Sequence, residues 1–358
     1  MPQVADKPRT VLVARFSALG DVAMTIPVVY SACRCHPDTR FVMVTRPSMT
    51  SIFVDAPANL TVVGADVKER YAGVSGIATL CRELRAEYAP YIFVDLHNVL
   101  RTRLMGAFLR FHGVGTVRII KPRAKRRALT RRRNKVMLPL TGQRARYREA
   151  FFKAGLPIVE RFNGLYGGHG KAPAERFAAI TATAAEGVRR VGIAPFAAHD
   201  GKVYPPELME QVVAMLQADA DGGRPLEVFL FGGGDKEKEI LDAWEARYPV
   251  VRSLAGKKYG FAAELALLNH LDVMLSMDSA NMHLAAIANT PTLSIWGATH
   301  PYCGFKGWRQ TDDDTIQLPL ECRPCSVFGD KPCFRGDLLC LSAIKPAAVH
   351  AKILEKIS

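Results

Sequence analysis

The stretch Leu271–Pro301, LDVMLSMDSANMHLAAIANTPTLSIWGATHP, decides the expected fold. A short apolar strand is predicted over Leu271–Met277, an apolar helix over Met282–Ala288, and a second strand over Thr292–Trp296. Asn289-Thr290-Pro291 ends the helix, because proline cannot continue it. This order predicts one βαβ unit of a parallel sheet.

Polar side chains gather where the first of these strands meets the helix, at Asp278, Ser279 and His283. Ligands bind at this edge of open α/β sheets, and a helix start offers free N–H groups to a phosphate. A second polar turn, Gly297–Pro301, follows at the same edge. A structural interpretation stays open, in which Asp278 and Ser279 only cap the helix and His283 packs against it.

Length and composition indicate a globular protein of two domains. The chain has 358 residues, of which 49% are hydrophobic, and this is long for a single core. No run of about 18 apolar residues occurs, so no transmembrane helix is expected. The start MPQVADKPRT lacks the apolar core of a signal peptide, so we expect the chain in the cytosol.

Basic residues are concentrated in the first half of the chain. Residues 1–165 carry 28 Lys and Arg against 11 Asp and Glu, while residues 166–358 carry 20 against 23. Lys121–Lys135 holds nine basic residues and no acidic one. An anionic partner is therefore expected, either nucleic acid, an anionic membrane surface or an acidic glycolipid. The alternative is a solvated, mobile segment, and the lack of aromatic residues argues against single-stranded nucleic acid.

The first half opens with a strand, a glycine turn and a helix. The strand is predicted over Thr10–Phe16, the turn over Ser17–Asp21 and the helix over Val22–Cys35. The turn has neither the G-x-G-x-x-G of a dinucleotide site nor the lysine of a P-loop. Asp21, at the helix start, points into any cleft above the sheet edge, or only favours the helix dipole.

Strands and helices then alternate, which predicts a parallel sheet with helices on both faces. Asp95, His97 and Asn98 end one strand and could line the same cleft, although structural roles fit them equally. The predicted strands are 40–45, 60–63, 91–96 and 114–120, and the predicted helices are 75–88, 100–111 and 142–154.

A glycine-rich linker, Gly164–Pro173, separates this first domain from a second doubly wound domain. We therefore expect domains over 1–165 and 166–343, with a last helix in 344–358 that could pack back across either. In the second domain, helices are predicted near 174–187, 206–218, 236–247 and 261–269, and strands at 188–194, 227–231 and 250–254.

Two loops of the second domain carry candidate binding groups. Pro195–Pro205 contains His199 and Lys202. Gly232–Asp235 is a glycine turn, which lets the backbone approach a ligand closely.

Four cysteines near the end are spaced C-x2-C-x7-C-x6-C. The spacing suits a structural zinc ion, although the second pair is too wide for a ribbon knuckle. Reduced or partly bonded thiols are the alternative, and both remain open. These residues are Cys322, Cys325, Cys333 and Cys340.

Three stretches together resemble the ADP-heptose:lipopolysaccharide heptosyltransferases of glycosyltransferase family nine. They are Arg15–Pro27 (RFSALGDVAMTIP), His199–Pro205 (HDGKVYP) and Asp278–Pro301, with DSANMHLAA and WGATHP. The cysteine-bearing tail, ECRPC followed by Cys333, is also similar to the family's C-terminal segment. The likeness covers nearly the whole chain in order.

The resemblance implies the α/β GT-B fold, with two Rossmann-like doubly wound domains facing a cleft. The N-terminal domain would bind the acceptor and the C-terminal domain the nucleotide sugar. Asp21 matches the family's catalytic base, and Lys202 matches the lysine on the donor diphosphate.

The resemblance and the turn positions together give the remaining site residues. The sequence departs from the family at Ala280, where a glycine is usual, at Ala197-Ala198, where Thr-Thr is frequent, and at Gly233-Gly234, where a glutamate is expected. The expected donor-binding residues are Asp278, Ser279, Ala280, His283, Gly233, Thr299 and Asp235, the last as a substitute on ribose. The expected acceptor-binding residues are Arg15, Ser17, Arg126, Arg127, Arg131, Arg132 and Arg133.

These residues suit glycosyl transfer with inversion. A carboxylate such as Asp21 can take the proton of an attacking hydroxyl, while Lys202 and the amides of Ser279–Asn281 stabilise the leaving diphosphate. No D-x-D motif occurs in a metal-binding context, since Asp312–Asp314 lies in a polar loop. We therefore expect metal-free transfer that needs no cofactor beyond the ADP-sugar donor.

The sequence thus predicts an enzyme that moves a heptose or similar sugar from an ADP-sugar to an anionic glycolipid. The acceptor would be a lipopolysaccharide core or lipid A-type precursor, the location peripheral to the cytoplasmic face of the inner membrane, and no nucleic acid is expected as a partner. One alternative is a GT-B enzyme with another nucleotide sugar or acceptor. The other is a basic nucleic-acid- or membrane-binding protein without catalysis.

Overall fold

The computed structural model describes residues 9–167 and 170–358, so Gly168 and His169 of the predicted linker lie outside the described residues. The described chain divides into two compact units. Of the described residues, the first unit comprises those up to Lys121 and Gln143–Phe162, and the second comprises Pro122–Gly142 and those from Asn163 to Ser358.

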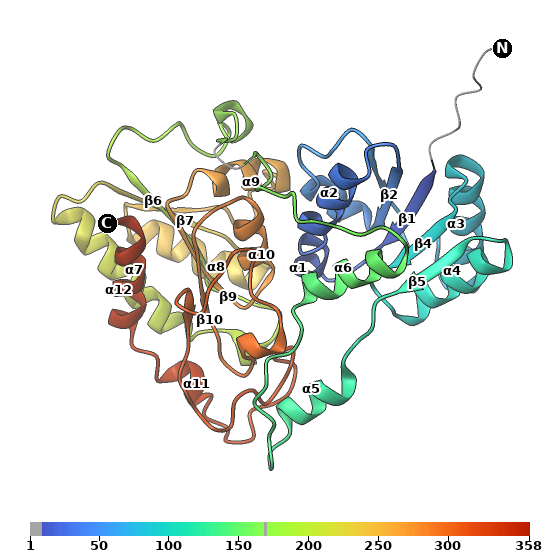
Figure 1. The fold of residues 1–358 in the computed structure, drawn as a ribbon. Helices are drawn as coiled ribbons and strands as arrows, with labels where there is room; N and C mark the ends of the chain where they lie inside the picture. Colours follow the sequence, from blue (N-terminus) through green and yellow to red (C-terminus); the bar gives the residue numbers. More distant parts are fainter. Residues whose placement is uncertain (1–8, 168–169) are drawn as a thin grey trace. The chain divides into compact units, whose positions relative to one another are not determined.

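The first unit is built on a five-stranded parallel sheet in the order β3-β2-β1-β4-β5. Figure 1 shows β1 between β2 and β4. All five residues of β1 are buried, as expected for a central strand covered on both faces. The strands are β1 (Thr10–Ala14), β2 (Arg40–Thr45), β3 (Leu60–Gly64), β4 (Ile92–Asp95) and β5 (Gly115–Arg118).

Successive side chains of a strand point to opposite faces of the sheet, and because both faces are apolar, helices cover both. Val42 joins the core cluster formed with α3 and α4, while its neighbour Phe41 meets Phe151 of α6. The helices are α1 (Leu19–Ala23), α2 (Ile26–Cys35), α3 (Gly73–Tyr88), α4 (Leu100–Phe111) and α6 (Gln143–Lys153), with the 3-10 helix η1 at Pro47–Ile52.

The single helix predicted over Val22–Cys35 is wrong, because the structure has two helices there, α1 and α2. Pro27 is the second residue of α2. In the first turn of a helix the missing proline N–H breaks no intrahelical hydrogen bond. Pro27 therefore marks the start of α2.

The second unit is built on a six-stranded parallel sheet in the order β11-β10-β9-β6-β7-β8. In each unit the first strand lies in the middle, and the strand order reverses beside it. The predicted α/β class with two doubly wound sheets is therefore confirmed. The strands are β6 (Arg189–Ala194), β7 (Leu226–Leu230), β8 (Val251–Ser253), β9 (Val273–Met277), β10 (Thr292–Ile295) and β11 (Thr315–Ile316).

The helix predicted near 174–187 is wrong, since only the 3-10 turn η2 (Ala174–Arg176) forms there. The segment contains β-branched Thr181 and Thr183, and it ends at Gly187, which has a φ of +82°. The other helices of this unit are α5 (Arg123–Thr130), α7 (Pro206–Asp221), α8 (Asp235–Arg247), α9 (Phe261–Asn269), α10 (Ala280–Ile287), α11 (Leu339–Ser342) and α12 (Pro346–Ile357), with the 3-10 helices η3 (Asp200–Lys202) and η4 (Pro301–Cys303).

The basic run belongs to the second unit, although the sequence places it in a first domain of residues 1–165. We call Pro122–Gly142 the basic strap. Lys135 Nζ donates hydrogen bonds to the carbonyl oxygens of Cys322 (2.7 Å) and Pro324 (3.0 Å). The backbone N–H of Leu140 donates to the carbonyl of Tyr302. These contacts tie the C-terminal part of the strap to loops that follow β10 and β11.

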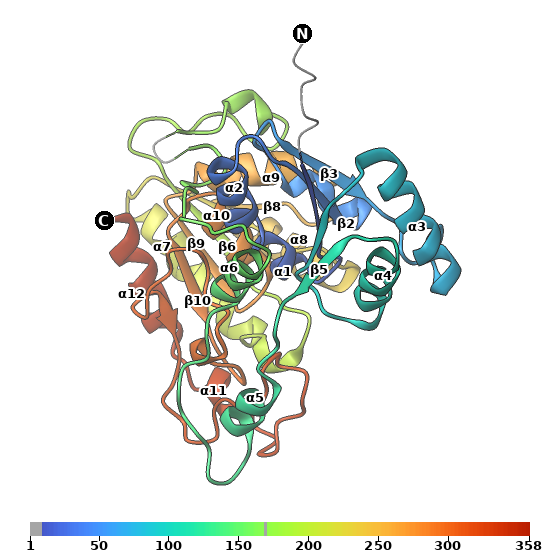
Figure 2. The ribbon, with the colours of Figure 1, turned by 45° about the vertical axis from the view of Figure 1, so that its right-hand side comes forward.

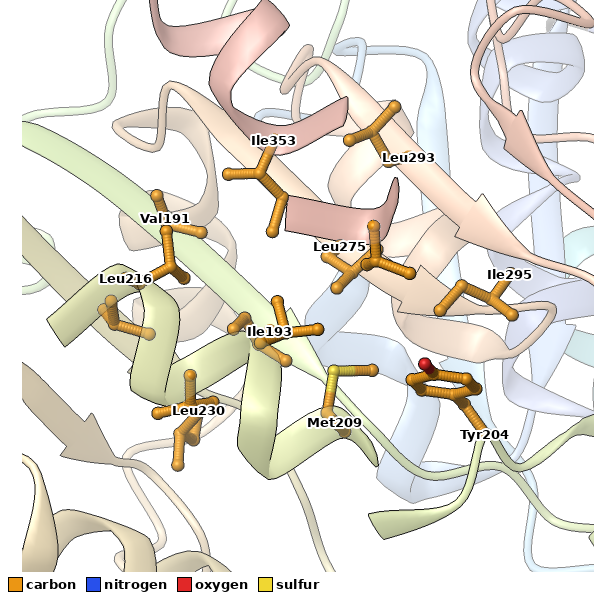
Figure 3. Packing of buried hydrophobic residues seen from close by; sticks show 14 of the residues in the cluster. Val191, Ile193, Tyr204, Met209, Leu216, Leu230, Leu275, Leu293, Ile295 and Ile353 are labelled. Atoms are coloured by element: carbon orange, nitrogen blue, oxygen red, sulfur yellow. The ribbon is translucent and has the colours of Figure 1, made fainter. Parts of the chain in front are cut away.

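The last helix, α12, completes the core of the second unit. Figure 3 shows Ile353 of α12 beside Val191 of β6 and Leu275 of β9. The hydroxyl of buried Tyr204 donates to the carbonyl oxygen of Ile344 at 2.7 Å, just before α12. The sequence leaves open which domain the last helix packs on, and these contacts place it on the second.

We expect Ile353→Ala to lower the free energy of unfolding by about 2–5 kcal/mol, because it leaves a cavity in this core. Denaturant unfolding followed by circular dichroism measures the change. Glu355→Ala is the matched control, since Glu355 is exposed on the same helix. Equal stability of the two variants would contradict an integral role for α12.

Candidate active site

In the first unit the strand order reverses between β1 and β4, where a doubly wound sheet binds its ligand. The turn after β1 carries Arg15, Ser17 and Asp21. The turn after β4 carries His97 and Asn98. Because β1 and β4 are hydrogen-bonded neighbours, both turns lie at one edge of the sheet.

Asp21 lies in the first turn of α1 and is held by an ion pair. Arg15 Nη2 lies 2.5 Å from Asp21 Oδ2, and Arg15 Nη1 donates to the carbonyl oxygen of Leu96 at 2.8 Å. Tyr147 adds a hydrogen bond to the Asp21 carbonyl oxygen at 3.2 Å. Arg15 is buried, while the Asp21 side chain remains 22% exposed. The carboxylate is thus fixed in direction and still accessible to a substrate.

Ser17 and His97 meet across the same strand reversal, with 3.5 Å between Ser17 Oγ and His97 Nε2. Burial lowers the pKa of His97 to about 3, and the nearby charges of Arg15 and Lys121 act in the same direction. The imidazole is therefore neutral at physiological pH, so it can take part in hydrogen bonds without adding charge.

Asp95 was predicted either to line the cleft or to have a structural role, and its hydrogen bonds are structural. Its Oδ1 accepts the backbone N–H groups of His97 (2.9 Å) and Asn98 (2.7 Å). Asn98 has a left-handed φ of +49° and donates its side-chain amide to the carbonyl of Ile119. Asp95 therefore shapes the turn that presents His97.

In the second unit the strand order reverses between β6 and β9, and the structure brings two predicted residues together there. Lys202, at the end of η3, forms an ion pair with Asp278, which directly follows β9. Lys202 Nζ lies 3.0 Å from Asp278 Oδ2, and the two side chains are 16% and 5% exposed. A cation is thus held at the expected ligand-binding edge by one buried carboxylate.

Close backbone packing holds Lys202 in place. The N–H of Ala298 donates to the carbonyl oxygen of Gly201 at 2.8 Å. Gly329 lies against the lysine stem, since a Cβ at Gly329 would come within 2.6 Å of Lys202 Cγ. Gly329 also has a φ of +77°. No local sequence pattern links Gly329 to a lysine so distant in the chain, so its role could not be predicted.

The start of α10 lies beside this ion pair. Ser279 precedes α10 in extended conformation, and its side chain makes no capping hydrogen bond, so the capping interpretation does not hold for its hydroxyl. Its Oγ lies 3.2 Å from Ser276 Oγ instead. Ala280 is the first helical residue, and His283 is buried one turn later. The first N–H groups of α10 remain available to an anion.

The turn after β10 adds Thr299. Its side chain is fully buried, and its hydroxyl finds no hydrogen-bond partner among the residues that the structure describes. Buried Arg323 donates to the carbonyl oxygens of Trp296 and Thr299, both at 2.9 Å, and also to Gly297. Arg323 thus fixes the turn that carries Thr299, and no pattern within the cysteine-bearing tail indicates this role.

Gly233 and Asp235 lie at another turn, after β7. Both are exposed, and open space surrounds Gly233. The N–H of Gly233 donates to Glu237 Oε2 at 2.8 Å. Glu237 therefore brings to this turn a carboxylate that no sequence motif indicates.

The residues predicted to bind the acceptor are divided between the two units. Arg15 and Ser17 lie in the first unit, whereas the arginines of the basic strap lie in the second. Arg126 lies over the rings of Phe305 and Phe328, at 5.5 and 5.3 Å from their centroids. The others are exposed, namely Arg127, Arg131, Arg132 and Arg133.

The four C-terminal cysteines are free thiols in the structure. Burial raises the pKa of the Cys340 thiol to about 11. Over the described residues, no group of three or more His, Cys, Asp and Glu side chains is placed to hold a metal ion. The geometry therefore offers no support for the structural zinc alternative.

Sequence comparison identifies the family. The sequence model of glycosyltransferase family 9 (heptosyltransferase) matches residues 116–331. The chain is 37% identical over 106 residues to lipopolysaccharide heptosyltransferase 3 of Escherichia coli. It is 25% identical over 140 residues to lipooligosaccharide heptosyltransferase 2 of Campylobacter jejuni. These alignments cover 28% and 37% of this chain, but only 29% and 42% of the two relatives.

Solved structures share the fold over nearly the whole chain. A family 9 glycosyltransferase from Veillonella parvula matches with a TM-score of 0.73 at 15% identity, covering 99% of this chain and 98% of its own. E. coli ADP-heptose heptosyltransferase II matches with a TM-score of 0.67 at 15% identity, covering 97% and 98%. E. coli heptosyltransferase WaaC with ADP gives 0.63 at 18% identity, covering 98% and 100%. At these identities the likeness establishes the fold alone.

The family match spans more than half of the chain and includes the turns that carry Lys202, Asp278 and Thr299. The predicted resemblance is thereby confirmed: the chain belongs to glycosyltransferase family 9, the heptosyltransferases.

Proposed function

We propose that this protein is an inverting heptosyltransferase, which moves a heptose or similar sugar from an ADP-sugar to a lipopolysaccharide-type glycolipid. Family membership supports the reaction class. Relatives of similar fold were solved with ADP and with ADP-2-deoxy-2-fluoro heptose, and one partial sequence relative is a lipopolysaccharide heptosyltransferase. The observation that carries the proposal is the largely buried ion pair of Lys202 and Asp278.

This ion pair suits a diphosphate because it keeps a cation ready at the strand reversal. A buried ammonium without a partner would be costly, and Asp278 supplies that partner before a donor binds. A nucleotide diphosphate carries more negative charge than one carboxylate and offers several acceptor oxygens to Lys202. The N–H groups at the start of α10 and the Thr299 hydroxyl supply further donors to the same ligand.

In the proposed reaction Asp21 is the general base. Its carboxylate takes the proton of the acceptor hydroxyl as that oxygen attacks the anomeric carbon. The bond from this carbon to the diphosphate oxygen breaks, and ADP leaves with the electron pair. Lys202 and the amides of Ser279–Asn281 stabilise the charge on the departing diphosphate. Attack from the face opposite the leaving group inverts the anomeric centre.

The remaining expectations are part of the same proposal. The transfer needs no metal or cofactor besides the ADP-sugar, and the acceptor is an anionic glycolipid at the cytoplasmic face of the inner membrane. The exposed arginines of the basic strap support an anionic acceptor. As for the membrane, the described residues include no helix that is both long and apolar enough to span it.

Asp21→Asn is expected to lower the rate of transfer roughly 100-fold to 10,000-fold, the usual contribution of a general base. The amide keeps the shape of the side chain but cannot take the proton. The dissociation constant of ADP should stay unchanged, because Asp21 lies outside the donor-binding unit. A transfer assay with ADP-heptose and a nucleotide titration measure the two quantities.

Asp38→Asn controls for the loss of one negative charge, since Asp38 is exposed in the same unit. It should transfer at the unmodified rate. Full turnover by Asp21→Asn would remove Asp21 as the base.

Lys202→Ala is expected to weaken ADP binding by at least about 30-fold, since it removes the buried cation that faces the diphosphate. Calorimetric titration measures this affinity, and thermal unfolding verifies that the variant is folded. Lys345→Ala is the control, because that lysine is exposed in the same unit, before α12. Unchanged affinity in folded Lys202→Ala protein would contradict the assigned role.

A further inference from the structure

The outer face of the basic strap combines positive charge with exposed apolar side chains. The strap, Pro122–Gly142, contains eight basic residues and no acidic one. Three consecutive apolar residues follow its arginines, and Val136, Met137 and Leu138 are 39%, 42% and 66% exposed. Such residues are usually turned inward, so an exposed run beside a charge cluster indicates an interaction surface.

The strap is held in a defined conformation. Helix α5 is anchored by Leu129, which is 1% exposed. The N–H of Val136 donates to the carbonyl oxygen of Ala128, which folds the segment after α5 back onto that helix. Lys135 donates hydrogen bonds to the carbonyl oxygens of Cys322 and Pro324. The arginines and the apolar run are therefore presented together.

Two exposed aromatic rings extend the same face. Phe328 and Phe334, in the loop before α11, are 43% and 48% exposed. Arg126 lies over Phe328, and the Arg132 guanidinium lies 4.3 Å from the centroid of Phe334. Figure 2 shows α5 beside this part of the second unit. The strap and this loop are thus in contact, and together they present arginines and exposed apolar side chains.

We propose that this surface docks the protein on an anionic phospholipid bilayer. Arg131, Arg132 and Arg133 would contact lipid phosphates, while Met137 and Leu138 would enter the boundary between headgroups and acyl chains. Basic residues next to exposed apolar ones are the combination by which peripheral proteins bind anionic membranes. The proposal rests on the proposed location at the membrane, but it does not depend on the transfer reaction.

A bilayer fits this surface better than a nucleic acid does. A nucleic-acid backbone would bind the arginines through its phosphates. It offers no apolar surface on which the three adjacent aliphatic side chains could be buried. A bilayer satisfies both groups, because its phosphates lie directly above its hydrocarbon. The positive charge of the strap therefore favours an anionic partner, and its exposed apolar residues favour a lipid surface over a nucleic acid.

Sedimentation with vesicles tests the proposal on the full chain. Vesicles of phosphatidylcholine alone are compared with vesicles of phosphatidylcholine and phosphatidylglycerol in equal parts. The unmodified protein should bind only the second kind, and salt should weaken this binding. Replacing Arg131, Arg132 and Arg133 by serine should weaken it about 100-fold. Met137→Asp together with Leu138→Asp should weaken it about 10-fold or more.

Matched variants in the first unit serve as controls. Serine at Lys68, Arg82 and Arg110 removes three exposed positive charges, and Phe111→Asp replaces an apolar side chain that is 86% exposed. Both should bind vesicles like the unmodified protein. ADP affinity is measured for all variants, so that a failure of membrane docking is distinguished from a failure of donor binding.

Three results would overturn the proposal. One is the absence of binding to anionic vesicles by the unmodified protein. Another is an equal loss of binding in strap variants and controls, which would indicate that only net charge matters. The third is a strap that is required for binding duplex DNA and not for binding vesicles.

Discussion

The ion pair of Lys202 and Asp278 is the interaction on which the second unit's site depends. It joins the loop after β6 to the loop after β9, and these two strands flank the point where the sheet order reverses. A largely buried lysine is stabilised by a charged partner, and Asp278 supplies one directly at the end of a buried strand. The close approach of Gly329 to the lysine then restricts its stem.

The first unit repeats this principle with the charges exchanged. There the ion pair of Arg15 and Asp21 lies in the loop after β1, and Arg15 also reaches the carbonyl of Leu96 after β4. In the second unit the Asp278 carboxylate orients the ammonium group of Lys202, and in the first unit the Arg15 guanidinium orients the Asp21 carboxylate. Both ion pairs lie at the point where the strand order of a doubly wound sheet reverses, which is where such sheets bind ligands.

Much of this could be predicted from the sequence because the relevant signals are local. An apolar run ending in a polar turn placed Asp278 at a sheet edge, and the resemblance to the family singled out Lys202; the structure brings the two to 3.0 Å. The unit to which the basic strap belongs could not be predicted, since it depends on Lys135 and a carbonyl 187 residues away. The roles of Arg323 and Gly329 likewise arise from tertiary packing, for which charge and periodicity give no signal.

The most direct test of the central claim is a thermal-unfolding screen with ADP, UDP, GDP, CDP and their sugars. A ligand that binds only the folded state raises the melting temperature, by an amount that grows with the logarithm of its concentration divided by its dissociation constant. Selective stabilisation by ADP and ADP-heptose is predicted, and it should be lost when Lys202 is replaced. Selective stabilisation by another nucleotide would contradict a site built for an ADP-sugar. The absence of stabilisation by any of these ligands would contradict it as well.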